Sequence, residues 1–143
     1  MRASGPRYAR MAIPLDLAEL SLADPALAQA AALWDPAGAP IVLVTVVGPG
    51  PHASGLSGEA QDAALQALAD DARARFGVPF QVAVLREHDP AATGDEALER
   101  CFAAHDIDLV VMRSHAPAFS DHWLPAHGRW LATHSARSLL LLR

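Results

Sequence analysis

Imidazole side chains that could ligate a metal ion gather in the last third of the chain, at His115, His122, His127 and His134. His127 and His134 are seven residues apart, which on a helix separates them by about 10 Å. That distance is too long for one ion to bind both imidazoles directly. The chain also has no His-Glu-x-x-His motif or other familiar ligand spacing. We therefore expect surface histidines and no metal site.

Nucleophilic side chains occur without the neighbours that would activate them. Ser114-His115 and Ser120-Asp121-His122 contain the residue types of a hydrolase triad, but adjacent residues rarely form one. No Gly-x-Ser-x-Gly motif precedes them. Cys101 lies at helical spacing from Leu98 and Phe102, which predicts a small core residue and not a reactive thiol. We expect no catalytic residue.

Composition excludes several classes of protein. The 143 residues include 11 lysine-or-arginine positions, all of them arginine, which excludes a Walker-type phosphate loop and a Schiff-base enzyme. A net charge of −5 argues against a nucleic-acid partner bound through a basic surface. The single cysteine, and the lack of a signal peptide or a stretch long enough to span a membrane, predict a cytoplasmic protein with no membrane partner.

The elements that must position these residues are short apolar stretches alternating with longer segments of helical period. The apolar stretches are residues 11–15, 41–47, 80–85, 107–112 and 138–142, and the helical segments are 24–34, 57–77, 95–105 and 125–134. The stretches are continuously apolar, which is typical of strands buried on both faces. Residues 48–58 are rich in Gly, Pro, Ser and His, so we expect a flexible loop there.

This alternation predicts a single α/β domain over residues 1–143, a parallel sheet with helices on both faces. Ligands of such sheets bind outside the carboxyl ends of the strands, where the strand order reverses. That rule places Asp16, the pair Val46-Val47 and residues 112–115 around one crevice.

Five segments, in order, resemble the universal stress protein family across nearly the whole chain. They are Ile13-Pro14-Leu15-Asp16, Leu43-Val44-Thr45-Val46-Val47, His88-Asp89-Pro90-Ala91, residues 105–115 and residues 134–142. Residues 105–115 carry the most specific match, close to the family's Asp-x-Asp-Leu-Ile-Val-Met-Gly-Ser-His. The resemblance implies a Rossmann-like, adenine nucleotide alpha hydrolase-like fold with a five-stranded sheet. It also implies a stress-response role, and commonly a homodimer formed through the final strand, here Ser138 to Leu142.

Some members of that family bind ATP, and the resemblance implies which residues would do so here. Asp16 and Val46 stand at the positions that meet the adenine, with Pro14 and Met112 beside them. The phosphates lie on a loop patterned Gly-x2-Gly-x9-Gly-Ser/Thr, which in this chain would begin at Arg113 and include Ser114 and His115.

That phosphate loop is degenerate in this sequence. When the chain is aligned with this pattern, the positions of the three glycines are occupied by Arg113, by Ala116 and by Pro125 or Ala126. Proline has no N–H to donate, and side chains at the other positions crowd the approach of main-chain amides to a phosphate. Each lost bond to a charged acceptor is worth about 1.5–3 kcal/mol. We therefore expect weak or absent ATP binding and no resident cofactor, with ATP or AMP as the candidate ligands.

Asp16 and Arg113 also have structural interpretations that involve no ligand. Asp16 is an adenine ligand or a capping residue between strand and helix. Arg113 contacts a phosphate or is a solvated or interface residue. The function we favour is a non-enzymatic, homodimeric regulatory module with possible protein partners. The alternatives are a binder of adenine compounds with fewer phosphates, acting through Asp16 and Val46, and a slow ATP hydrolase.

Overall fold

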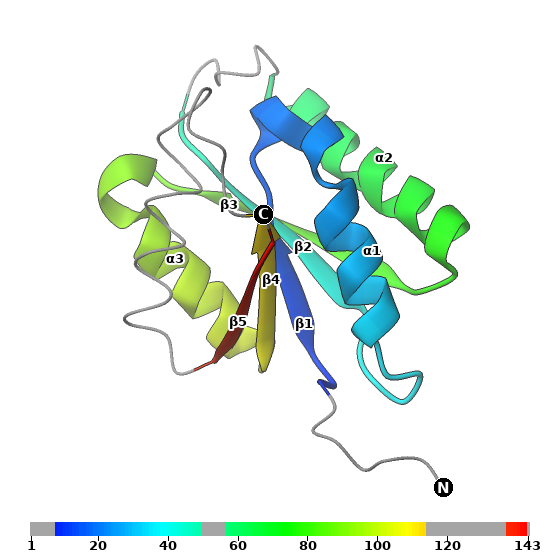
Figure 1. Ribbon diagram of the computed structural model, residues 1–143. Coiled ribbons are helices and arrows are strands. Elements are labelled where there is room, and N and C mark those ends of the chain that lie inside the picture. The colour runs from blue at the N-terminus through cyan, green and yellow to red at the C-terminus, as the bar shows by residue number, and fades with distance from the viewer. Residues whose placement is uncertain (1–7, 50–56, 114–136, 143) are drawn as a thin grey trace, which may run out of the picture.

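The structure is a computed structural model that describes residues 8–49, 57–113 and 137–142. Its elements are β1 (Met11–Pro14), the 3-10 helix η1 (Leu17–Leu22), α1 (Asp24–Leu33), β2 (Ile41–Val47), α2 (Gly58–Phe76), β3 (Phe80–Arg86), α3 (Pro90–Ala104), β4 (Leu109–Arg113) and β5 (Ser138–Leu142). The five strands form one sheet in the order β3-β2-β1-β4-β5, and every pairing is parallel (Figure 1). The predicted α/β fold with a five-stranded parallel sheet is confirmed.

β1 lies at the centre of the sheet, and the strand order reverses beside it. Ala12 is level with Val42 on one neighbour and with Val110 on the other. The chain builds β2 and β3 outward on one side of β1, then returns to place β4 and β5 on the other. The carboxyl ends of β1 and β4 therefore form the switch point at which such sheets bind ligands.

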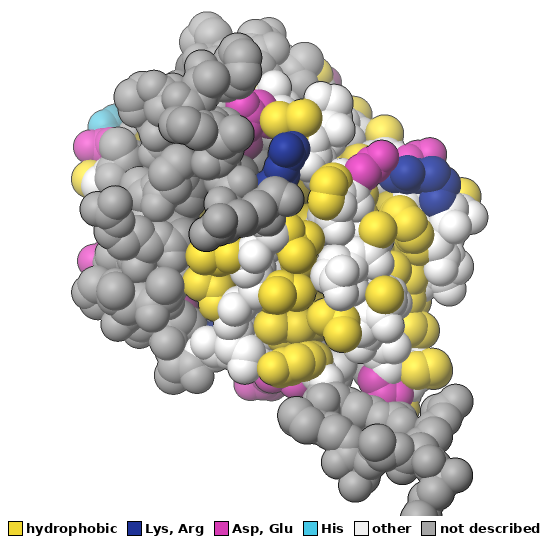
Figure 2. All heavy atoms as spheres, viewed as in Figure 1, with side chains coloured by type: hydrophobic (Ala, Val, Ile, Leu, Met, Phe, Trp, Pro, Cys, Tyr) yellow, Lys and Arg dark blue, Asp and Glu magenta, His cyan; other side chains and the backbone are white. Residues whose placement is uncertain are grey.

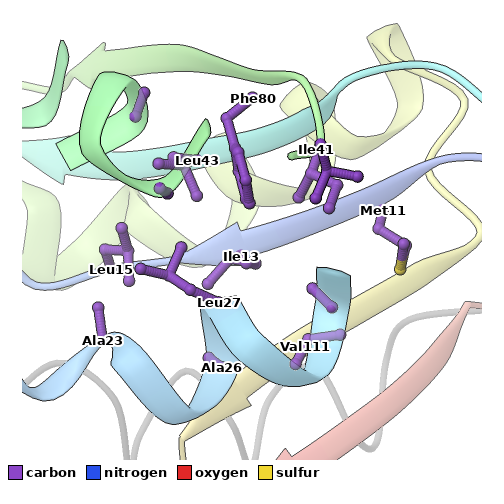
Figure 3. Close-up of a cluster of buried hydrophobic side chains, with 14 of the residues drawn as sticks. Met11, Ile13, Leu15, Ala23, Ala26, Leu27, Ile41, Leu43, Phe80 and Val111 are labelled. Atoms are coloured by element: carbon purple, nitrogen blue, oxygen red, sulfur yellow. The ribbon is translucent and has the colours of Figure 1, made fainter. Parts of the chain in front are cut away.

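Helices cover both faces of the sheet, as the continuous apolarity of the strands predicts. Side chains such as Ile13, Leu43 and Val111 point to one face and pack with α1 and α2 (Figure 3). Their neighbours Ala12 and Val44 point to the other face and pack with α3. All seven residues of β2 are buried, so both cores meet along the centre of the sheet.

The helix ends follow the local sequence closely. Ser57 caps α2, its hydroxyl accepting from the Ala60 N–H at 3.4 Å, and Gly77 ends that helix in the left-handed region with φ 69°. The helix expected from residue 95 begins earlier, at Pro90, because Asp89 caps it and a proline suits the first turn. The helix expected over 125–134 and most of the loop expected over 48–58 lie outside the described residues.

The motif at 105–115 includes residues that stabilise the opposite, amino-terminal edge of the sheet. Asp106 has φ 52°, a left-handed conformation that turns the chain from α3 toward β4. The Asp108 carboxylate then accepts hydrogen bonds from the N–H groups of Ala9 and Arg10 at 3.0 and 3.1 Å. These bonds hold the start of β1 beside β4, so this part of the motif has a structural role away from the switch point.

Candidate functional site

The switch point carries a small cavity at the carboxyl ends of β1 and β4. It has a volume of about 30 Å³ and is lined by Pro14, Leu15, Asp16, Glu19, Leu22, Ala23, Ala26 and Arg113. Three residues that the sequence assigned to the crevice, Pro14, Asp16 and Arg113, therefore lie around one cavity. Its remaining lining residues come from the end of β1, from η1 and from the start of α1.

Asp16 is held in place by main-chain bonds at the end of β1. The Leu15 N–H donates to the Val44 carbonyl at 2.8 Å, which extends the pairing of β1 with β2. The Asp16 carboxylate Oδ1 accepts from the Ala18 N–H at 2.9 Å and so caps η1. Asp16 was expected to be an adenine ligand or a capping residue, and the structure shows that it caps η1. The carboxylate's other oxygen, Oδ2, has no hydrogen-bond donor among the described residues.

Arg113 is the last residue of β4 and lines the cavity with a partly buried side chain. Residues alternate between the faces of a strand, and Val111, two residues earlier, packs on the α1 side. Arg113 therefore faces α1 as well, toward Asp16 and Glu19. No carboxylate within residues 8–49, 57–113 and 137–142 forms an ion pair with its guanidinium.

Val46 and Met112 have their side chains in the hydrophobic core. They are 2% and 0% exposed, and both pack on the α3 side of the sheet. They are not among the residues that line the cavity. A direct contact with a ligand would therefore use their main-chain groups, and their role in the crevice stays a prediction.

The remaining candidates lie outside the described residues. They are Ser114, His115 and the degenerate loop positions after them, together with His122, His127 and His134. Within the described ranges, no three His, Cys, Asp or Glu side chains are grouped closely enough to hold a metal ion.

Cys101 matches the core role expected from its spacing. Its thiol is buried with Leu98 and Phe102, and burial raises the pKa of the Cys101 thiol. The only polar neighbour that contacts its sulfur among the described residues is His105, whose Nδ1 lies 3.7 Å from Sγ. Because a raised pKa keeps the thiol protonated, this side chain is a poor nucleophile.

Sequence reasoning missed the contribution of η1 and the start of α1 to the site. Glu19, Leu22, Ala23 and Ala26 all line the cavity. The signal that could have revealed this turn is Asp16-Leu17-Ala18-Glu19, which has the spacing of a capping box. Leu17, the first residue of the turn, is buried and anchors it.

A second hollow lies near the carboxyl ends of β2 and β3. It measures about 350 Å³ and is lined by Gly48, Pro49, Gly58, Gln61, Arg86, Glu87 and His88. Its charged groups already have partners: Arg86 donates to Asp62 at 2.7 Å, and Glu87 accepts from Arg100 at 2.7 Å. The hydrogen bonds of Arg86 to Gln61 and Gly58 join the end of β3 to the first turn of α2, which is a structural role.

The fold is that of the universal stress proteins. The family's model matches residues 7–143, and the chain belongs to the Universal stress protein family. A comparison with curated proteins found no match. Among the described residues, no helix combines the length and apolarity needed to span a membrane.

Solved structures of low sequence identity share the fold. A universal stress protein family member from Burkholderia pseudomallei is 24% identical, with 96% of this chain and 98% of that chain covered and a TM-score of 0.60. One from Archaeoglobus fulgidus in complex with dAMP is 13% identical, with coverages of 95% and 98% and a TM-score of 0.60. A universal stress protein in complex with cAMP is 19% identical, with coverages of 96% and 98% and a TM-score of 0.57.

Proposed function

We propose that this protein is a non-enzymatic stress-response module that acts by binding and holds ATP weakly or not at all. The residue at position 113 carries the proposal: Arg113 stands where the family pattern has a glycine, and it lines the small cavity at the switch point. The last residue of β4 thus has a bulky, cationic side chain where the family pattern allows the main chain to approach phosphates.

Equilibrium binding tests this function directly. We expect isothermal titration of the full chain with ATP to give no heat, or a Kd well above about 10 μM, which corresponds to less than about 7 kcal/mol of binding free energy. A Kd tighter than that value would contradict the proposal. Titration in the presence and absence of Mg²⁺ separates a weak nucleotide site from a missing metal ion.

A ligand with fewer phosphates is the second candidate. The position of Asp16 at the cavity supports it, as do the solved relatives in complex with dAMP and with cAMP. Thermal shifts with adenosine, AMP, ADP and ATP compare the two hypotheses. Stabilisation by adenosine or AMP but not by ATP favours this second function, and no stabilisation by any of the four removes it.

Slow ATP hydrolysis is the third hypothesis, and it would need a placed base and a metal ion held by phosphates. Any turnover found in purified protein can be assigned with the variant Asp16→Ala. If turnover is unchanged in that variant, the crevice is not its source.

We further propose that the chain forms a homodimer through β5. This strand lies at the edge of the sheet, and no described strand pairs with its outer side. Its sequence is Ser-Leu-Leu-Leu-Leu, with Leu141 46% exposed. On the face seen in Figure 2, hydrophobic side chains gather over β5 and α1. An apolar edge strand needs a covering partner, and an isologous contact with a second copy supplies one.

A single domain and a cytoplasmic location complete the proposal. Core side chains from β1 to β5 pack on one sheet, which supports a single folding unit over residues 1–143. The protonated, buried thiol of Cys101 suits a reducing compartment. Cell fractionation tests the location, and limited proteolysis tests the single domain.

A further inference from the structure

We propose that the side of β5 that faces α1 is a docking site for one helix of a partner protein, a helix with an uncharged apolar stripe. This β5 face consists of Leu140 and Leu142 on the strand, together with Leu22 just before α1 and Leu33 at its end. The inference rests on the proposed homodimer, because two β5 strands side by side set the width of the site.

The helices on this side of the sheet leave β5 uncovered. Neighbouring strands lie about 4.8 Å apart and packed helices about 8–10 Å apart, so one helix covers two strands. α2 packs against β3 at one edge of the sheet, and α1 packs across β1 and β4. Among the described residues, no helix remains for the fifth strand on this side, and Leu140 and Leu142 are only half-buried there.

The exposed leucines beside α1 lie on the side of that helix away from α2. Asp24, the first residue of α1, is bound by Arg75 of α2 at 2.8 Å, so it marks the α2 side. Leu33 follows about two and a half turns later, which places it on the opposite side. Leu22 lines the cavity together with Arg113 at the end of β4. The two leucines, 40% and 38% exposed, therefore extend the apolar surface of β5.

The chemistry of α1 indicates the character of the partner. No residue from 25 to 34 is charged, although a helix at a protein surface ordinarily carries charges on its outer side. α2 follows that rule, with exposed charged residues from Glu59 to Arg75. Hydrophobic side chains of α1 and β5 gather on one face of the molecule (Figure 2). Such a surface fits an apolar stripe, because a charged segment would lose its hydration there without gaining an ion pair.

The homodimer indicates that the partner segment is a helix. Isologous antiparallel pairing of β5 with its copy keeps both α1 helices on the same side of a continuous sheet. Because α1 lies over β1 and β4, four strand spacings separate the axes of the two α1 helices, which is about 19 Å. A third helix between them lies about 9–10 Å from each, the usual distance between packed helices. An extended strand would leave most of that width empty.

The experiment measures binding of a fluorescein-labelled synthetic helix of about 15 residues to the full chain by fluorescence anisotropy. The peptide has leucine at every third or fourth position, lysine on the opposite side, and alanine and glutamine elsewhere. We expect saturable binding of one peptide per dimer. Leu33→Glu should weaken it at least about tenfold, and Leu33→Ala should weaken it less. Ala67→Glu, the matched control, adds the same charge at an exposed alanine of α2 and should match wild type.

A second peptide of the same composition has its leucines distributed around the helix and should bind at least about tenfold more weakly. Equal binding of the two peptides, no binding of either, or unchanged binding by both Leu33 variants overturns the inference. Dissociation of the homodimer by Leu33→Glu in light scattering would assign this face to the second copy and overturn it too. A monomeric wild type refutes the proposed homodimer and the inference with it, whereas with a dimeric wild type the peptide measurements test this inference alone.

Discussion

Replacing Asp16 separates its capping role from a role in ligand binding. The carboxylate accepts one bond from the Ala18 N–H at 2.9 Å at the start of η1. Removing such a cap costs about 0.5–2 kcal/mol. Because η1 has only six residues and Glu19 departs from helical geometry at φ −133°, we expect Asp16→Ala to lie near the lower limit, at about 0.5–1 kcal/mol. In a chain of this size, 1 kcal/mol lowers Tm by about 2–4 °C.

Asp16→Asn and Asp16→Ser are the matched controls, because asparagine and serine also cap helices well. Both should retain nearly all of the free energy of unfolding in urea denaturation with an unchanged m-value. If the carboxylate also contacts a ligand, Asp16→Asn should lose the thermal shift given by adenosine or AMP while keeping the stability of wild type. Wild-type stability in Asp16→Ala would refute the capping argument, and equal destabilisation in all three variants would assign the effect to charge.

Three further predictions concern other parts of the molecule. Asp108→Ala removes two hydrogen bonds to the start of β1 and should lower the free energy of unfolding in urea by about 1–3 kcal/mol. Asp108→Asn keeps one acceptor and should lower it by about half as much. Equal losses of stability in the two variants would contradict this role of the carboxylate. Leu141→Arg should convert the proposed dimer to a monomer in light scattering, whereas Gln81→Arg at the opposite sheet edge should not; the reverse result would move the interface to β3. The hydrogen bond from Arg75 lowers the pKa of Asp24, so this pair stabilises the fold above the ordinary pKa of 3.8 and loses that contribution as the pH falls through the lowered value. Arg75→Ala should therefore be less stable than wild type at pH 7 and converge with it in strong acid, and a difference that persists there would refute the ionic origin.

The strands were the part of the fold most readily predicted from the sequence. The stretches at 41–47 and 138–142 match β2 and β5 to the residue, because continuous burial demands an unbroken apolar run. Helix α3 was predicted too short, since Pro90 resembled part of a loop motif, whereas Asp89 and Pro90 together start the helix. Sequence periodicity identifies the apolar stripe of a helix better than its polar first turn.

The candidate site was predicted less completely, for reasons of side-chain direction. Pro14, Asp16 and Arg113 line one cavity because all three lie at the ends of neighbouring strands, and their role in binding a ligand stays a prediction. The motif does not indicate that Val46 is turned into the core on the α3 side. A shift of one residue along a strand reverses the face of a side chain, and only the pairing register settles which face meets the crevice.

That register also fixes the direction of the side chain at position 113. Met112 packs in the α3-side core and is fully buried, so the next residue of β4, Arg113, faces α1, where it lines the cavity. The place of Arg113 at the cavity is therefore a consequence of strand geometry, which the motif alone does not reveal.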